Sequence, residues 1–146
     1  MGDISKDINS KFKDQRSKAF LNIKYTANWI NSKEVEFFKS YGISPQQYNI
    51  LRILRGAGKE TKVQVVKERM VERAPNVTRL MDKLLEKNLI VRHRCDKDRR
   101  VVFVEITDEG LLLLSEVDTQ ISDLNLLKNL SKEEAKVLSD LLDKIR

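Results

Sequence analysis

The sequence is poor in the residues that build disulfides and metal sites. Its 146 residues include one cysteine and one histidine, which excludes a disulfide within the chain and leaves too few soft ligands for a zinc site made by one chain. No apolar run approaches the roughly 18 residues that cross a bilayer, and the first residues lack the pattern of a secretory signal. We therefore expect a cytoplasmic protein with no membrane contact, no metal site and no cofactor.

The motifs of common enzyme classes are also missing. The sequence has no phosphate-binding glycine loop, no nucleophile elbow and no metalloprotease helix, and its single histidine restricts acid–base chemistry. The sequence therefore predicts that the protein is not an enzyme and has no catalytic residues. Five glycines and two prolines in a chain rich in lysine, glutamate and leucine predict a mainly α-helical fold.

Positive charge is concentrated in the middle of the chain. Lys and Arg outnumber Asp and Glu by 10 to 5 in residues 1–58 and by 13 to 7 in residues 59–100, whereas residues 101–146 hold 5 against 10. The three parts therefore carry +5, +6 and −5, and the middle part alone matches the net charge of +6. Such a segment is typical of a surface that meets a polyanion. The alternative is a solvated surface of mixed charges.

Apolar spacing predicts amphipathic helices at both ends. Over about residues 5–32 the apolar side chains recur mainly every three or four residues, which predicts one long helix. Near the other end, Thr107 is placed to cap a long helix, and Ser131 with Glu134 forms a capping box for a last one. These ends carry more apolar helix surface than the centre needs, so we expect them to form a dimerisation region over about 5–32 and 108–146. The alternative is that they complete the core of a monomer.

The centre, about residues 44–107, predicts a small DNA-binding lobe. A capping box at residues 44–47 begins one helix, a second follows, and a proline-marked turn leads to a third helix with a single apolar stripe. Asn88 is suited to the left-handed conformation that closes this third helix. Two apolar strands around the charged residues 96–100 then form a hairpin. This order is that of a winged helix-turn-helix, so the predicted fold is mainly α with a small β-hairpin wing.

The third helix and the hairpin supply candidate DNA contacts. A helix of this kind enters the major groove, where Asn76 suits adenine, Arg79 suits guanine and Thr78 suits a base or a phosphate. Arg100 suits a narrow minor groove, with Asp98 holding the guanidinium rather than touching DNA. The alternatives are an ordinary amphipathic helix and a solvated turn with a weak surface ion pair.

Four segments resemble the MarR family of bacterial transcriptional regulators. They read NVTRLMDKL at 76–84, LIVR at 89–92, DRR at 98–100 and ITDEG at 106–110. The resemblance implies a homodimeric repressor in which each chain is a single domain over 1–146, and which binds an inverted repeat in double-stranded DNA and is released by a small effector. It places the recognition helix from Pro75 and the wing tip at Arg100. The predicted DNA-binding residues are Pro75, Asn76, Thr78, Arg79, Lys83, Asp98, Arg99 and Arg100.

The effector and its site are less defined by the sequence. Tyr25, Trp29 and Tyr48 are candidates for a pocket, although aromatic residues at helical spacing more often belong to a core. Metal sensing and thiol oxidation are disfavoured because His93 and Cys95 are the only soft ligands and lie in one strand. The rival function is a winged-helix module for protein or RNA contacts without sequence-specific DNA reading.

Overall fold

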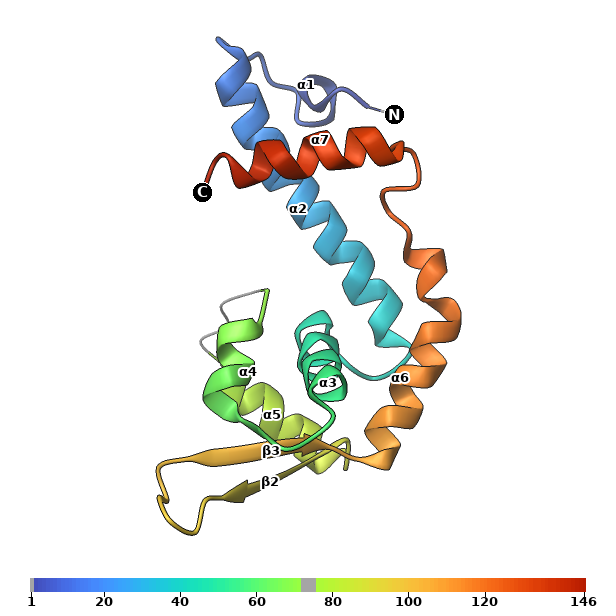
Figure 1. The fold of residues 1–146 in the computed structure, drawn as a ribbon. Helices are drawn as coiled ribbons and strands as arrows, with labels where there is room; N and C mark the ends of the chain where they lie inside the picture. The colour runs from blue at the N-terminus through green and yellow to red at the C-terminus, as the bar shows by residue number, and fades with distance from the viewer. Residues whose placement is uncertain (1, 72–75) are drawn as a thin grey trace.

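The computed structural model describes residues 2–71 and 76–146, and this part of the chain is mostly helical. A lobe of short helices and strands lies at one end, and long helices extend from it (Figure 1). None of the described helices is both long and apolar enough to cross a membrane. The elements are, in chain order, α1 (Ile4–Asp7), α2 (Gln15–Lys39), α3 (Pro45–Ala57), β1 (Thr61–Lys62), α4 (Val63–Arg69), α5 (Val77–Glu86), β2 (Ile90–Arg94), β3 (Val102–Ile106), α6 (Asp108–Gln120), the 3₁₀ turn η1 (Ile121–Leu124) and α7 (Lys132–Asp143).

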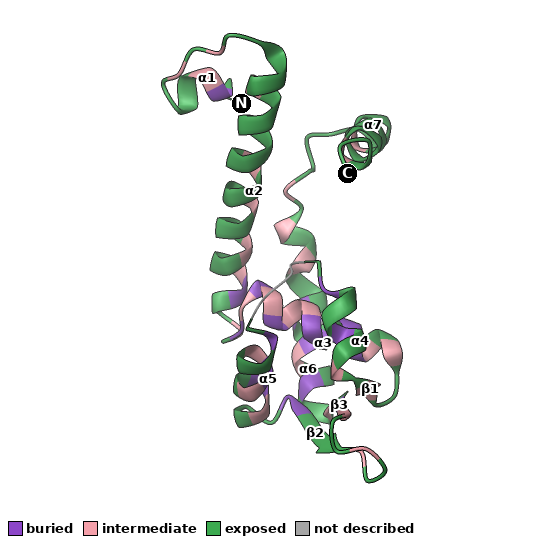
Figure 2. Ribbon diagram, turned by 90° about the vertical axis from the view of Figure 1, so that its left-hand side faces the viewer, coloured by how far each residue is buried: buried purple, intermediate pink, exposed green. Residues whose placement is uncertain are grey.

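The hydrophobic core lies in the lobe. Buried side chains from the end of α2, from α3, α4 and α5, from β2 and β3 and from α6 form one cluster. Figure 2 shows the buried positions gathered there, while α2 and α7 are exposed over most of their length. The lobe therefore has a core of its own, to which the end of α2 and the start of α6 also contribute. Its fully buried large side chains are Phe38, Ile50, Leu51, Leu54, Met81, Leu84, Ile90 and Leu114.

The predicted hairpin is present and belongs to a slightly larger sheet. β2 and β3 pair antiparallel, with Arg92 opposite Val104 and His93 opposite Phe103. β1 pairs with the other edge of β3, giving the strand order β1-β3-β2. The sequence analysis missed β1 because a strand of two residues carries no readable alternation.

The expectation of one helix over about 5–32 was wrong. Asn9 adopts a left-handed φ of 47° after α1, and Asp14 begins α2 by accepting hydrogen bonds from the backbone N–H groups of Arg16 and Ser17. The local cap outweighs the apolar spacing that runs through Phe12. α2 then continues past the expected end near residue 32 to Lys39, and Gly42, at φ 70°, lies in the turn beyond it.

The predicted starts of α3 and α7 and the predicted end of α5 are confirmed by their caps, whereas α5 begins at Val77, two residues after the predicted start of the recognition helix. Ser44 Oγ accepts from the Gln47 N–H at 3.1 Å, and Gln47 Oε1 accepts from the Ser44 N–H at 2.9 Å. Ser131 and Glu134 make the same reciprocal pair at the start of α7. Asn88 has the expected left-handed φ of 56° after α5, so α5 is followed almost directly by β2.

Candidate nucleic-acid interface

Helix α5 presents a polar face away from the core. Val77, Met81 and Leu84 are buried on its inner side. Thr78, Arg79 and Lys83 are exposed, as the apolar stripe of the sequence requires. Asn76, also exposed, is the N-cap residue but makes no side-chain cap hydrogen bond, so its amide is not used to close the helix. Pro75 was also assigned to DNA contact and lies outside the described residues.

At the tip of the wing, the Asp98 carboxylate holds the Arg100 guanidinium by two hydrogen bonds, and we call this pair the Asp98–Arg100 fork. Asp98 Oδ1 accepts from the Arg100 backbone N–H at 3.0 Å and from Arg100 Nε at 3.2 Å, while Oδ2 accepts from Nη2 at 3.3 Å. The hydrogen bonds from Arg100 lower the pKa of the Asp98 carboxyl below its usual 3.8. The Arg100 side chain is nevertheless 92% exposed, so the fork presents the guanidinium to solvent. Arg99, beside it, is exposed as well.

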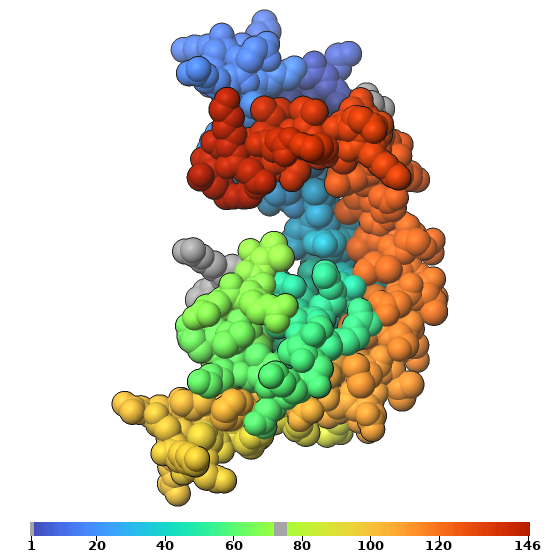
Figure 3. Space-filling view, viewed as in Figure 1, coloured from blue at the N-terminus to red at the C-terminus, as the bar shows by residue number. Residues whose placement is uncertain are grey.

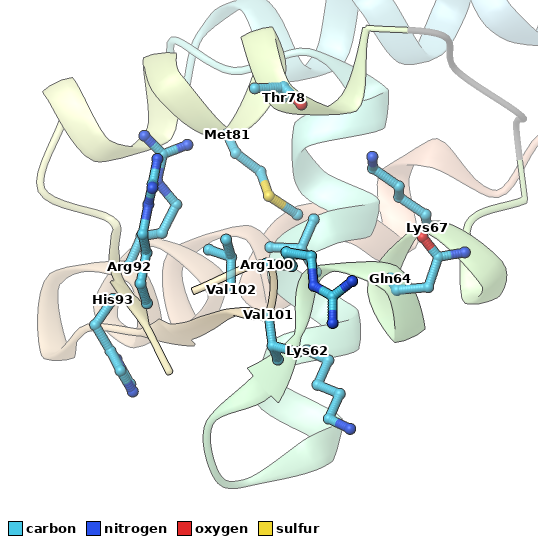
Figure 4. A pocket seen from close by; sticks show the side chains of 12 residues that line it. Lys62, Gln64, Lys67, Thr78, Met81, Arg92, His93, Arg100, Val101 and Val102 are labelled. Atoms are coloured by element: carbon cyan, nitrogen blue, oxygen red, sulfur yellow. The ribbon is translucent and has the colours of Figure 1, made fainter. Parts of the chain in front are cut away.

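A cationic groove lies between α4, α5 and the wing. It encloses about 650 Å³ and brings Thr78 of α5 and Arg100 of the wing to one surface (Figure 4). The sequence analysis identified the charge excess of residues 59–100 and the role of Arg100, but not the other basic residues of this groove as DNA contacts, because they are spread over β1, α4 and β2. The basic lining residues are Lys62, Lys67, Arg92, His93, Arg94 and Arg100.

An ion pair and a histidine–carboxylate contact tie β2 of the wing to the rest of the lobe. Arg92 Nη1 lies 2.9 Å from Asp82 Oδ1 of α5. On the next residue, His93 Nε2 lies 3.0 Å from Glu60 Oε2, and its ring stacks on Phe103 with 5.5 Å between the centroids. In the space-filling view the wing tip projects from the lobe beyond these contacts (Figure 3). The outer part of the wing is therefore open to a partner.

The structure brings together only two of the three candidate effector residues. Tyr25 and Trp29 of α2 line a hollow of about 290 Å³ beside α1, together with Asp7 and Thr26. Tyr48 lies in α3 and stacks on Phe38, with 4.4 Å between ring centroids. Burial raises the pKa of the Tyr48 phenol above its usual 10. Tyr48 thus belongs to the edge of the core, as the alternative in the sequence analysis had it.

His93 and Cys95 are the single histidine and the single cysteine of the chain. Outside residues 1 and 72–75, no three His, Cys, Asp or Glu side chains are grouped so that they could hold a metal ion. Cys95 is a free, half-buried thiol at the end of β2.

Comparisons with known proteins place the chain among transcriptional regulators. Residues 35–117, which span the lobe, match the model of the transcriptional regulators SarA/Rot. The HTH-type transcriptional regulator MhqR of Bacillus subtilis is 25% identical over 130 residues, covering 88% of this chain and 89% of MhqR. The HTH-type transcriptional repressor MdtR of the same organism is 38% identical over 88 residues, which cover 60% of this chain and 56% of MdtR.

Solved structures agree with this placement. The MarR transcription factor from Planctomyces limnophilus is 32% identical, with a TM-score of 0.71 over 91% of this chain and 98% of that one. A mutant MarR from E. coli, complexed with operator DNA, has a TM-score of 0.79 at 22% identity, over 93% and 99% of the two chains. The regulator RdhR-CbdbA1625 bound to 2,4-dichlorophenol has a TM-score of 0.80 at 18% identity, over 91% and 80%. The chain therefore belongs to the transcriptional regulators of the MarR and SarA/Rot type.

Proposed function

We propose that two copies of this chain bind one inverted repeat in double-stranded DNA and repress transcription by occupying a promoter. Helix α5 of each copy enters a major groove, and each wing tip enters the neighbouring minor groove. The observation that carries this proposal is the arrangement of the interface: the exposed polar face of α5 and the Asp98–Arg100 fork flank one cationic groove. The operator complex of the E. coli relative supports DNA as the partner, and the description of MdtR supports repression.

The surface of the long helices supports the homodimer. α7 contributes no buried residue, and three of its apolar side chains, Val137, Leu138 and Leu141, are exposed, as is Ile145 just beyond its end. α7 crosses α2 in Figure 1, but the second view shows the two helices apart. Phe20, Ile23 and Trp29 of α2 are exposed as well. A second copy is the simplest partner for so much apolar helix surface, because an inverted repeat needs a two-fold symmetric reader.

The first experiment selects bound duplexes from a random DNA library and measures the protein's mass in the same solution. The proposal predicts a dimer that enriches an inverted repeat whose half-sites lie about one helical turn apart. Binding that is independent of sequence and collapses in modest salt would reduce the basic centre to a general electrostatic patch. The search would then turn to RNA or protein partners.

We extend the proposal to a small effector that releases the DNA by favouring an incompetent spacing of the two lobes. The dichlorophenol bound by RdhR-CbdbA1625 supports this class of ligand, and the hollow beside Tyr25 and Trp29 is a candidate site. Trp29 is the chain's only tryptophan, so its fluorescence reports directly on this hollow. A titration with 2,4-dichlorophenol is expected to change that fluorescence and to release the selected operator. A titration without either effect would leave no support for this ligand at this site.

A further inference from the structure

Helix α5 carries an acidic residue, Asp82, in the middle of the surface that is proposed to bind DNA. Asp82 is half-buried and stands one turn after Thr78 on the same side of the helix, since residues four apart in an α-helix are neighbours. A carboxylate there repels phosphate, so electrostatics alone favours any other residue at this position. Asp82 therefore needs an explanation other than contact with DNA.

The carboxylate of Asp82 forms an ion pair with an arginine of the wing. Arg92 Nη1 donates to Asp82 Oδ1 at 2.9 Å, and 48% of the Asp82 side chain and 35% of the Arg92 side chain remain exposed. This is the ion pair that connects α5 with the sheet. Figure 4 shows the Arg92 side chain rising from β2 toward α5, on the wall of the groove that Thr78 and Arg100 also line.

The alternation of side chains along β2 explains why Arg92 reaches α5. Side chains alternate between the two faces of a strand, so Arg92 lies on the same face of β2 as Ile90. Ile90 is 1% exposed and packs in the core. Arg92 continues that face where the core ends, and its aliphatic stem can follow the apolar surface while the guanidinium meets Asp82. His93 lies on the opposite face with Glu60.

A contact between α5 and β2, such as the Asp82–Arg92 ion pair, is needed if the wing tip and α5 are to reach DNA together. The turn after α5 fixes only the start of β2, through the left-handed Asn88 and the hydrogen bond from Thr107 Oγ1 to the Asn88 carbonyl. Arg100 lies beyond the far end of that strand. A small change in the angle between α5 and β2 therefore moves the wing tip more than it moves the root. The Asp82–Arg92 pair constrains this angle two residues further along β2.

We propose that Asp82 and Arg92 are positioning residues for DNA reading: their ion pair sets the angle between the recognition helix and the wing, so that the side chains of α5 and Arg100 engage one site together. This inference rests on the proposed function. A half-exposed ion pair contributes little to folding stability. We therefore expect this pair to act on the angle between α5 and β2, and through that angle on the discrimination between DNA sequences.

Replacing Asp82 changes DNA affinity in opposite directions according to whether Asp82 positions the wing or only repels phosphate. Asp82→Asn removes one negative charge from α5, and so does the control Glu86→Gln one turn later, at an exposed residue of the same helix. If only charge matters, both variants bind all DNA more tightly. If the pair positions the wing, Asp82→Asn loses about tenfold in affinity for the selected operator, the size of one misplaced base contact, while its affinity for a scrambled duplex is unchanged or higher.

The experiment measures fluorescence anisotropy of the full chain on the operator and on the scrambled duplex at two salt concentrations. The exchange variant Asp82→Arg with Arg92→Asp keeps the net charge and can reform the pair in reverse, so it is expected to regain part of the discrimination. Circular dichroism of each variant reports its folding, and the exchange variant tests the pair if Asp82→Asn does not fold. Equal behaviour of Asp82→Asn and Glu86→Gln, or an exchange variant no more selective than Arg92→Asp alone, would overturn the inference. Failure of the unmodified chain to prefer its operator would instead refute the proposed function.

Discussion

At the scale of single residues, the wing tip is the clearest candidate for a specific contact. Arg100 combines an almost fully exposed side chain with a guanidinium held by Asp98 at two points. Holding the side chain in place reduces the conformational entropy that a free arginine loses when it binds. An arginine prepared in this way suits a narrow minor groove, where the negative potential is enhanced.

Replacing Arg100 with alanine is expected to cost about 1–3 kcal/mol on the selected operator and to relax discrimination at the minor-groove positions. Lys83→Ala is the comparison, because an exposed lysine that meets phosphate weakens binding to all sequences alike. Both are measured as dissociation constants on operator and scrambled duplexes. Equal losses on the two duplexes for Arg100→Ala would refute the assignment of the wing tip.

The same fork makes a prediction about protonation. Hydrogen bonds from Arg100 lower the pKa of Asp98 below 3.8, so the fork is complete above the usual pKa of an aspartate and is lost as the pH falls through the lowered value. Arg100→Ala is expected to return the Asp98 pKa toward 3.8, measured from the side-chain carboxyl carbon by NMR. Asp14 is the internal reference, since its lowered pKa comes from Ser17 and should not change. An Asp98 titration identical in both proteins would contradict the fork.

At the scale of elements, the junction between β3 and α6 tolerates no side chain at Gly110. A Cβ built there meets the Leu89 carbonyl oxygen and lies 2.6 Å from Ile106 Cγ1. Gly110→Ala is therefore expected to lower the free energy of unfolding by about 1–3 kcal/mol, the usual cost of overpacking. Urea denaturation at one fixed protein concentration measures it, because the proposed dimerisation would make stability depend on concentration.

Gly56 provides the matched control for this substitution. It lies in α3 with no atom within 4 Å of its added Cβ, so Gly56→Ala is expected to stabilise the chain by about 0.5–1 kcal/mol through helix propensity. A Gly110→Ala variant as stable as the unmodified chain would mean that the strand–helix junction adjusts freely.

The elements that could be predicted from the sequence are those set by local signals. The capping box of Ser44 and Gln47 and the apolar stripe of α5 each depend on neighbours in the chain, and the structure has both. The break before α2 was missed because apolar spacing around Phe12 was given more weight than the cap at Asp14. The tie between Asp82 and Arg92 could not be predicted, because it depends on the angle between a helix and a strand, which no local pattern specifies.

At the scale of the whole molecule, the core and the proposed dimer surface are separate. The buried cluster lies in the lobe, whereas no α7 residue is buried in the single chain. Folding of the lobe and association through α7 can therefore be tested independently. The composition of the chain ends predicts such an interface but does not specify how the helices cross in it, because apolar spacing is a property of each helix alone.

Leu141→Glu is expected to break the dimer without unfolding the lobe. Leu141 is 56% exposed in the single chain. Burial of such a side chain is worth about 1.5–3 kcal/mol, and a two-fold dimer loses it twice, so the dimer Kd should rise at least about a hundredfold. Analytical ultracentrifugation measures the mass, and circular dichroism reports folding. Ser139→Glu is the control, since it adds the same charge to the polar side of α7 and should leave the dimer intact.

A Leu141→Glu variant that remains a dimer would place the interface away from α7. A monomer that still binds one half-site weakly would show that each lobe reads DNA alone and that dimerisation supplies the remaining affinity.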